Sequence, residues 1–170
     1  ATDNFLEKNY PYGQNITALG IEEPKEFSLR YPQVKVVQYN GSIFPFGDKK
    51  FDIGWSNAVI EHVGNYESQL LFVKELHRTC KRFFFTTPNR HFPVEVHTRI
   101  PLLHFLPKKI FDSILMTVGK KWATGNYMNL LSKRKIKKLL MDAGIMKYTI
   151  VENSFFFFTL DFIIIVHEND

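Results

Sequence analysis

Short apolar runs alternate with segments of helical period in the first half of the chain, and this alternation restricts the fold more than any other feature. Runs typical of strands lie at 15–22, 34–39, 49–56 and 82–88. Between them, 22–32 predicts a short helix or turn. The segment 66–80 predicts a helix, because its apolar residues Leu70, Val73, Leu76 and Cys80 recur at helical spacing. Strands separated by helices indicate βαβ units, so we predict an α/β protein with a mostly parallel sheet.

The pattern changes after Pro88. The segment 89–131 mixes prolines with basic and aromatic residues, and it is interpreted as a cap or insertion with one helix near 107–118. A clearer helix follows, with Ser132 as N-cap and Gly144 as the stop. The closing residues predict two strands joined around Glu152, Asn153 and Ser154, hence a C-terminal antiparallel hairpin. Residues 1–170 are predicted to form a single domain that contains this insertion.

Bulk properties limit the class of protein. The chain has 170 residues and no apolar run of the roughly 18 residues that a membrane span requires. Its start has no apolar core of a signal peptide, and its single cysteine, Cys80, forms no internal disulfide, which fits the reducing cytoplasm. The formal charge of +5 suits an acidic partner but does not require one.

Small and polar residues follow four of the predicted strands. They lie at 20–22, 40–42, 56–58 and 87–89. In an open α/β sheet, ligands bind beyond the carboxyl ends of the strands, so these residues predict a ligand-binding edge. The alternative is that they are ordinary polar loops.

Three stretches resemble class I S-adenosylmethionine-dependent methyltransferases, in the branch that acts on small molecules. They are "GSIFPFGDKKFDIGWSNAVIEHV" (41–63), "ELHRTCKRFFFTTPN" (75–89) and "LSKRKIKKLLMDAGI" (131–145), and the resemblance extends over most of 15–166. It implies a Rossmann-like sheet with an antiparallel last strand, and S-adenosylmethionine as cofactor. The fold class is therefore α/β with a mostly parallel methyltransferase sheet and a C-terminal antiparallel hairpin.

The resemblance also implies roles for individual residues. Asn40 would lie near the adenine amine, where the family usually has an acid, and the adenine wall would consist of Gly41, Ser42 and Ile43. The methionine part of the cofactor would lie along Ser56, Asn57 and Ala58. Glu61 and His62 would begin the next helix beside the methyl-transfer cleft, with Glu61 counted among the cofactor-binding residues. Alternatively, Glu61 is an acid favoured by the helix dipole and His62 only packs or caps.

Two features depart from the family pattern. Gly20 stands where an acid usually binds the ribose hydroxyls, so Glu22 or Glu23 would have to replace that acid. The family's first strand and glycine-rich loop have no counterpart in residues 1–14, which contain only Gly13. We therefore expect an N-terminally truncated methyltransferase without its first strand. Such a chain would bind the cofactor weakly and could form a homodimer through an exposed sheet edge.

The implied reaction needs alignment of acceptor and methyl group, and a base only where the acceptor loses a proton. His62 is the candidate catalytic base, and His91, His97 and His104 in the insertion are weaker candidates. Their spacing matches no metal-ligand pattern, so no metal is predicted. The basic run at 132–138 covers one face of an ordinary amphipathic helix, so no nucleic-acid partner is predicted.

The acceptor is left as a small or lipid-like molecule. Residues 100–122 have the composition of a helix at a membrane surface or of a lid over an apolar acceptor, and the alternative is an ordinary domain cap. The second candidate function is not enzymatic. In it, the chain is a catalytically silent methyltransferase-like module that binds partners or forms oligomers.

Overall fold

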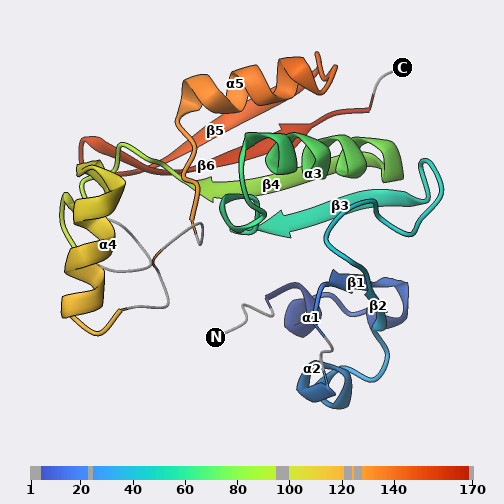
Figure 1. The fold of residues 1–170 in the computed structure, drawn as a ribbon. Coiled ribbons are helices and arrows are strands. Elements are labelled where there is room, and N and C mark those ends of the chain that lie inside the picture. Colours follow the sequence, from blue (N-terminus) through green and yellow to red (C-terminus); the bar gives the residue numbers. More distant parts are fainter. Residues whose placement is uncertain (1–4, 23–24, 95–99, 121–123, 125–127, 169–170) are drawn as a thin grey trace. The chain divides into compact units, whose positions relative to one another are not determined.

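The computed structural model describes residues 5–22, 25–94, 100–120, 124 and 128–168. It divides the chain into two compact units, Ala1–Pro45 (unit 1) and Phe46–Asp170 (unit 2). Each unit is considered by itself, and Figure 1 shows their elements. No helix of the described residues is long and apolar enough to cross a membrane.

Unit 1 holds a two-stranded parallel sheet. Its elements are α1 (Phe5–Asn9), η1 (Gly13–Asn15), β1 (Thr17–Gly20), α2 (Lys25–Arg30) and β2 (Lys35–Gln38). The register runs from Thr17 opposite Lys35 to Gly20 opposite Gln38. Both strands therefore end at the same edge of the sheet. This agrees with the βαβ unit predicted from the sequence.

Unit 2 holds a mixed four-stranded sheet in the order β3-β4-β6-β5. Its strands are β3 (Phe51–Asn57), β4 (Cys80–Pro88), β5 (Tyr148–Phe155) and β6 (Phe158–Val166). β3 and β4 are parallel, and β6 is antiparallel to both β4 and β5. The predicted C-terminal hairpin is thus confirmed. The predicted parallel strands, however, lie in two sheets, because β1–β2 and β3–β4 are not paired with one another in the described residues.

Helices cover one face of the unit 2 sheet. The helical elements are η2 (Ile60–His62), α3 (Tyr66–Thr79), η3 (Leu103–Phe105), α4 (Lys108–Thr117) and α5 (Lys133–Asp142). α3 contacts both β4 and α5, and the two helices lie on the same side of the sheet (Figure 1). The core between helices and sheet includes Val73, Leu76, Phe83, Phe85, Ile136, Leu139, Leu140 and Ile164. In the insertion, Leu103, Phe111 and Leu115 form a small separate cluster.

The predicted N-cap Ser132 and the predicted stop at Gly144 are confirmed, and Asn65 is an N-cap that was not predicted from the sequence. The Asn65 side chain accepts a hydrogen bond from the Ser68 N–H at the start of α3. The Ser132 side chain accepts one from the Lys135 N–H at the start of α5. Gly144 has a φ of +76°, the left-handed conformation in which a helix commonly ends. These three residues fix the limits of the two helices that cover the sheet.

Two predictions about element limits are wrong, and the predicted helix at 66–80 is confirmed as α3 but ends one residue earlier. Glu152, Asn153 and Ser154 lie inside β5, and the hairpin turns at Phe156 and Phe157 instead. The polar residues lie where the register shifts, between Asn153 and Ser154, so they mark a bulge and not the turn. Glu61 and His62 do not begin a helix, because they lie in η2 and α3 starts only at Tyr66.

Cys80 is the first residue of β4 and not part of the apolar helical stripe of α3. Its backbone is extended, although its N–H still donates to the carbonyl of Leu76. The helical spacing therefore runs one residue into the strand.

Candidate functional site

The loop after β3 is tied to the end of β4 by Thr86. The Thr86 hydroxyl donates to the Asn57 side-chain oxygen over 2.6 Å and accepts from the Ala58 N–H over 3.0 Å. Ala58 has a φ of +50°, which is uncommon for a residue other than glycine and costs of the order of 1 kcal/mol. Two strand ends of unit 2 thus meet in a constrained turn. The Asn57 side-chain oxygen is used in holding that turn.

Glu61 is fully buried behind this turn, with an exposed fraction of 0%. Its carboxylate oxygen Oε2 accepts a hydrogen bond from the Thr87 hydroxyl over 3.2 Å. Its backbone carbonyl accepts one from the Asn129 N–H over 2.8 Å. Burying a carboxylate costs desolvation free energy. A carboxylate that is buried in spite of this cost marks a candidate functional site.

Gln69 fixes the same turn from α3. Its side-chain amide donates to the carbonyls of Ile60 and Asn129, over 3.2 and 2.8 Å. Gln69 is itself buried, with 2% exposed. The η2 turn, α3 and the end of the insertion are therefore held together by polar contacts.

His62 lies beside the buried carboxylate and reaches solvent. Its side chain is 27% exposed, and its Nε2 is 4.0 Å from Glu61 Oε1. That separation is too long for a hydrogen bond but short enough for a charge interaction once the imidazole carries a proton. The His62 imidazole is therefore accessible to a ligand and lies next to the buried Glu61 carboxylate.

Ser56 supplies a further polar atom at the end of β3. It is 5% exposed, and its hydroxyl oxygen has no hydrogen-bond partner among the described residues. Buried hydroxyls are normally hydrogen-bonded, to protein, to water or to a ligand. Ser56 thus fits the predicted contact with a polar molecule at this edge.

In unit 1, the loops after β1 and β2 contact each other. The Gln38 side chain donates to the Ile21 carbonyl over 3.1 Å, and the Tyr39 N–H donates to the Gly20 carbonyl over 3.0 Å. Gly41 has a φ of +80°, and a Cβ added there would lie 3.6 Å from the Ile21 side chain. The loops therefore converge at the carboxyl edge of the sheet.

The predicted cofactor residues of unit 1 lie at this edge. The Asn40 side-chain oxygen accepts a hydrogen bond from the Ser42 N–H over 3.1 Å and so shapes the loop. Ile21 and Ile43 are 62% and 63% exposed, which leaves apolar side chains next to polar loop atoms. Gly20 ends β1, and Glu22 is exposed two residues later. Apolar side chains and polar loop atoms are thus exposed together at this edge, and no acid stands at Gly20.

The other candidates from the sequence contribute less. His91 is exposed, and its N–H donates to the Asn89 side chain over 3.0 Å. His97, Glu23 and the side chain of His104 lie outside the described residues. In the part of the chain that the structure describes, no three His, Cys, Asp or Glu side chains could hold a metal ion together.

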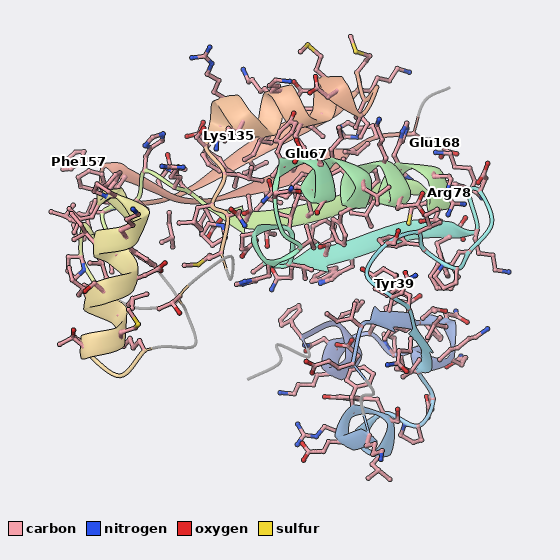
Figure 2. The ribbon with its side chains drawn as sticks, in the orientation of Figure 1. Tyr39, Glu67, Arg78, Lys135, Phe157 and Glu168 are labelled. Atoms are coloured by element: carbon pink, nitrogen blue, oxygen red, sulfur yellow. The ribbon has the colours of Figure 1, made fainter. Side chains whose placement is uncertain are left out.

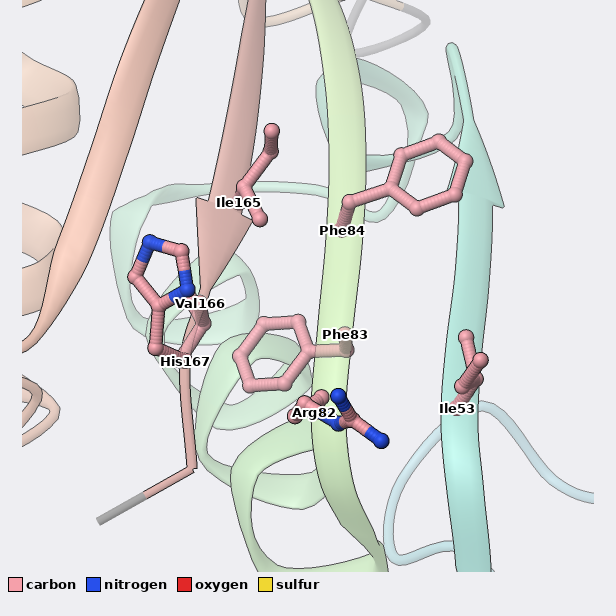
Figure 3. A pocket seen from close by; sticks show the side chains of 7 residues that line it. All are labelled: Ile53, Arg82, Phe83, Phe84, Ile165, Val166 and His167. Carbon is pink, nitrogen blue, oxygen red and sulfur yellow. The ribbon is translucent and has the colours of Figure 1, made fainter.

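Two surface hollows of unit 2 lie away from the predicted residues. One is lined by Ile53, Arg82, Phe83, Phe84, Ile165, Val166 and His167, as Figure 3 shows. It adjoins the amino-terminal parts of β3 and β4, whereas Ser56, Glu61 and His62 follow the carboxyl end of β3. The other lies along α5 and is lined by Lys137, Lys138, Met141, Ile145, Met146 and Tyr148. Neither hollow contains a predicted site residue.

The sequence prediction missed Thr86, Gln69 and Asn129 as members of the site. Gln69 had a readable signal, because it occupies the stripe of buried positions in α3 that continues with Val73 and Leu76. A polar residue on such a stripe needs a buried partner. Asn129 had none, since its partners Glu61 and Gln69 are distant in sequence.

Comparisons with known proteins agree with this geometry. A family model described as a methyltransferase domain matches residues 4–83, which span β1, β2, β3 and the turn that carries Glu61. Solved methyltransferase structures match nearly the whole chain. The family model covers just under half of the chain, and the solved structures show that the chain has the fold of S-adenosylmethionine-dependent methyltransferases. The comparisons thus confirm the predicted α/β fold and support the resemblance to methyltransferases that the sequence shows.

Three of the solved structures illustrate the likeness in fold. A SAM-dependent methyltransferase from Aquifex aeolicus is 16% identical, with a TM-score of 0.59 over 95% of this chain and 73% of that one. One from Methanosarcina mazei is 15% identical, with a TM-score of 0.54 over 88% and 79%. The third is the 1,6-didemethyltoxoflavin-N1-methyltransferase from Burkholderia thailandensis, with bound 1,6-didemethyltoxoflavin and S-adenosylhomocysteine. It is 14% identical, with a TM-score of 0.55 over 92% and 62%. No curated protein matches the chain.

Proposed function

We propose that this chain transfers a methyl group from S-adenosylmethionine to a small or lipid-like acceptor, with His62 as the base. The observation that carries the proposal is the buried carboxylate of Glu61 with Thr87 and His62 around it, directly after the carboxyl end of β3. In an α/β fold this is the edge at which ligands bind. A buried acid next to a partly exposed histidine suits proton transfer from a bound acceptor.

The proton has a defined route in this arrangement. When bound, the sulfonium cofactor supplies a methyl carbon that an acceptor lone pair can attack as the carbon–sulfur bond breaks. An acceptor with an O–H or N–H group must lose its proton in this reaction, and His62 would take it. The imidazolium that forms would then be held by the carboxylate of Glu61, 4.0 Å away. Glu61 itself is fully buried, so it would not contact the acceptor. Its role would be to position the His62 side chain and to stabilise the imidazolium.

The loops after β1 and β2 would contact the adenosine part of the cofactor. The exposed side chains of Ile21 and Ile43 would contact the adenine, the Asn40 loop would face its amine, and Gly41 would allow close approach. Glu22 would replace the ribose-binding acid that Gly20 lacks. Because Asn40 carries no charge and Glu22 follows the strand instead of ending it, we propose that cofactor binding is weaker than in relatives with acids at both places.

The residues at the end of β3 would contact the methionine part. Ser56 would use its buried hydroxyl, which lacks a partner in the described structure. Asn57 and Ala58 would contribute through the backbone of their constrained turn, because the Asn57 side-chain oxygen already binds Thr86.

Two measurements test the function. Calorimetric titration with S-adenosylhomocysteine tests cofactor binding, and we expect saturable binding that the substitution Gly41→Val weakens. A methyl-transfer screen over phenolic, amine and lipid-quinone acceptors tests activity. There we expect His62→Gln to lower the rate by about 10²-fold or more while binding of S-adenosylhomocysteine is kept.

The matched control for His62→Gln is His91→Gln, which changes an exposed histidine in the same unit. Equal loss of activity in both variants would contradict a role specific to His62. Failure of the chain to bind S-adenosylhomocysteine would contradict the enzymatic proposal as a whole. Binding with full activity in His62→Gln would leave methyl transfer standing but remove the base.

A second candidate function rests on a different observation. β3 is an edge strand of the unit 2 sheet, and its Ile53 and Trp55 side chains are 65% and 42% exposed. Exposed apolar edge strands pair readily with other chains. The chain could thus be a catalytically silent module that dimerises through β3. Light scattering after size-exclusion chromatography tests this, since a dimer that Ile53→Lys converts to a monomer would support it and a wild-type monomer would oppose it.

A further inference from the structure

Four consecutive phenylalanines form the tip of the C-terminal hairpin. Phe155 and Phe158 face each other across the last paired position, and Phe156 and Phe157 make the two-residue turn. Their exposed fractions are 59%, 81%, 97% and 52% in chain order. In Figure 2, Phe157 lies at the far end of the hairpin, beyond the covered part of the sheet. Such a concentration of exposed aromatic rings is rare on a monomeric protein and marks an interaction site.

The backbone at this turn does not favour phenylalanine. Phe156 has a φ of +53°, and two-residue hairpin turns with positive φ strongly prefer asparagine and glycine. A bulky residue in this conformation is strained. The ring of Phe156 touches that of Phe155, with centroids 4.8 Å apart, but it stays largely exposed. An aromatic side chain at position 156 therefore adds little to the stability of the hairpin. A role in binding explains the phenylalanine better than a role in folding does.

The tip lies at the same end of the sheet as the candidate site. Pro88, the last residue of β4, pairs with Asp161, three positions from Phe158. Asn89 then donates from its N–H to the Leu160 carbonyl and from its side chain to the Thr159 carbonyl, over 2.9 and 2.8 Å. The hairpin therefore projects beyond the carboxyl end of β4, next to the start of the insertion.

The insertion, whose two ends lie at this end of the sheet, is rich in basic residues. It leaves the sheet at Asn89 and returns at Leu131, which are joined by a bridge. Residues 89–131 contain six Lys and Arg against two acidic residues, so they carry +4 of the chain's formal +5. Apolar side chains of the same segment are also exposed, among them Leu102, Phe105 and Ile110 at 59%, 47% and 49%.

We propose that the phenylalanine tip, Phe155–Phe158, inserts into the interfacial layer of an anionic lipid bilayer and docks the chain there. Aromatic side chains are enriched where a protein meets the membrane–water interface, and basic residues add attraction to anionic headgroups. A second copy of the chain fits the tip less well. The four rings offer at most roughly 800 Å² per copy, and two convex tips cannot bury all of it against each other, whereas stable interfaces bury about 1,200–2,000 Å² in total. This inference concerns docking alone and does not depend on methyl transfer.

Vesicle co-sedimentation tests the docking. The vesicles are pure phosphatidylcholine or phosphatidylcholine with a third of phosphatidylglycerol. We expect the wild-type chain to sediment with the anionic vesicles, less with the neutral ones, and less at high salt. The double substitution Phe156→Gly with Phe157→Asn removes two rings and places glycine at the one turn position with a positive φ, so the hairpin should remain folded. We expect it to lower the partition onto anionic vesicles at least tenfold, an approximate figure for two lost aromatic contacts.

The control is Met146→Asn, which removes an apolar side chain that is 79% exposed beside the start of β5. It should bind vesicles like the wild type. Circular dichroism and the thermal midpoint of each variant show that the fold is kept. Unchanged sedimentation of the double variant, or no sedimentation of the wild type, would overturn the proposal. So would a wild-type dimer that the double variant abolishes without any vesicle binding, because the tip would then join two copies of the chain.

Discussion

The hydroxyl of Thr87 donates a hydrogen bond to the buried carboxylate of Glu61 over 3.2 Å, which joins the end of β4 to the turn after β3. These two strands are parallel neighbours, so the contact spans the edge at which an α/β sheet binds its ligands. Glu61 is fully buried, and His62 next to it reaches solvent. The ends of β3 and β4 thus fix the position of the Glu61 carboxylate, and the solvent-accessible His62 imidazole lies beside it.

The first prediction concerns the charge of Glu61. Glu61→Gln keeps the shape of the side chain and an oxygen for the Thr87 hydroxyl, so the thermal midpoint should stay the same or rise, because no charge is then buried. The rate of methyl transfer should fall by about tenfold or more, since nothing would stabilise the imidazolium of His62. Glu67→Gln, at an exposed acid in the first turn of α3, is the control. Equal rates for wild type and Glu61→Gln would refute the positioning role.

The second prediction concerns Asn40 and the cofactor. The Asn40 side-chain oxygen binds the Ser42 N–H, and an aspartate can keep that bond while adding the charge that the family usually has there. We therefore expect Asn40→Asp to bind S-adenosylhomocysteine about three- to tenfold more tightly, as one charge-assisted hydrogen bond would. Asn40→Ala should bind more weakly, because it also loses the loop contact. Calorimetry decides this, and tighter binding by the alanine variant would contradict the assignment.

The local signals in the sequence predicted most helix and strand positions. Ser132 and Gly144 stood at the ends of an amphipathic segment, where capping chemistry is explicit. The hairpin turn could not be found in this way, because Phe156 and Phe157 carry no turn signal and the polar residues Asn153 and Ser154 attracted the assignment instead. A turn occupied against its local preference can be recognised only from the pairing of the strands around it.

The candidate site was predicted in part. Its position at the strand ends followed from the order of strands and from the family motif that contains Glu61 and His62. The burial of Glu61 did not, because it depends on Thr87 and Asn129, which are far away in sequence. The division into two sheets also depends on which strands pair, and strand pairing is a long-range property that short windows do not contain.

The third prediction is a pH dependence of stability. Burial lowers the pKa of His77 below its usual value of about 6.5, and the nearby Lys49 lowers that pKa further. The unfolded chain therefore takes up this proton near pH ~6.5, whereas the folded chain does so only at lower pH. The free energy of unfolding should thus fall as the pH drops below about 6.5, until the lowered pKa is passed. Urea titrations of wild type and His77→Gln should show a smaller loss in the variant, and parallel curves would contradict this.

The fourth prediction concerns the ion pair of Arg78. Its guanidinium binds both carboxylate oxygens of Glu75, over 2.9 and 2.6 Å, and also the Phe46 carbonyl over 2.8 Å. Glu75 is 6% exposed, so loss of this partner leaves a buried carboxylate poorly satisfied. Arg78→Lys cannot form the paired contact, and we expect it to lower the free energy of unfolding by about 1–2 kcal/mol. Lys81→Gln, which breaks an exposed pair with Asp52, is the control and should cause no measurable change.

The last prediction tests the close packing of β3 against β4. A Cβ added at Gly54 would lie 2.8 Å from the Cys80 sulfur and 2.9 Å from the Phe83 Cβ, both closer than atoms in contact can approach. Gly54→Ala must therefore push the strands apart, and we expect it to cost about 1–3 kcal/mol of unfolding free energy. Gly47→Ala meets no atom within 4 Å and should change stability little. Denaturant titrations of both variants measure these changes. Equal free energies of unfolding for Gly54→Ala and Gly47→Ala would contradict the prediction. They would show that β3 and β4 can move apart at no cost and do not fix the position of the turn that carries Glu61.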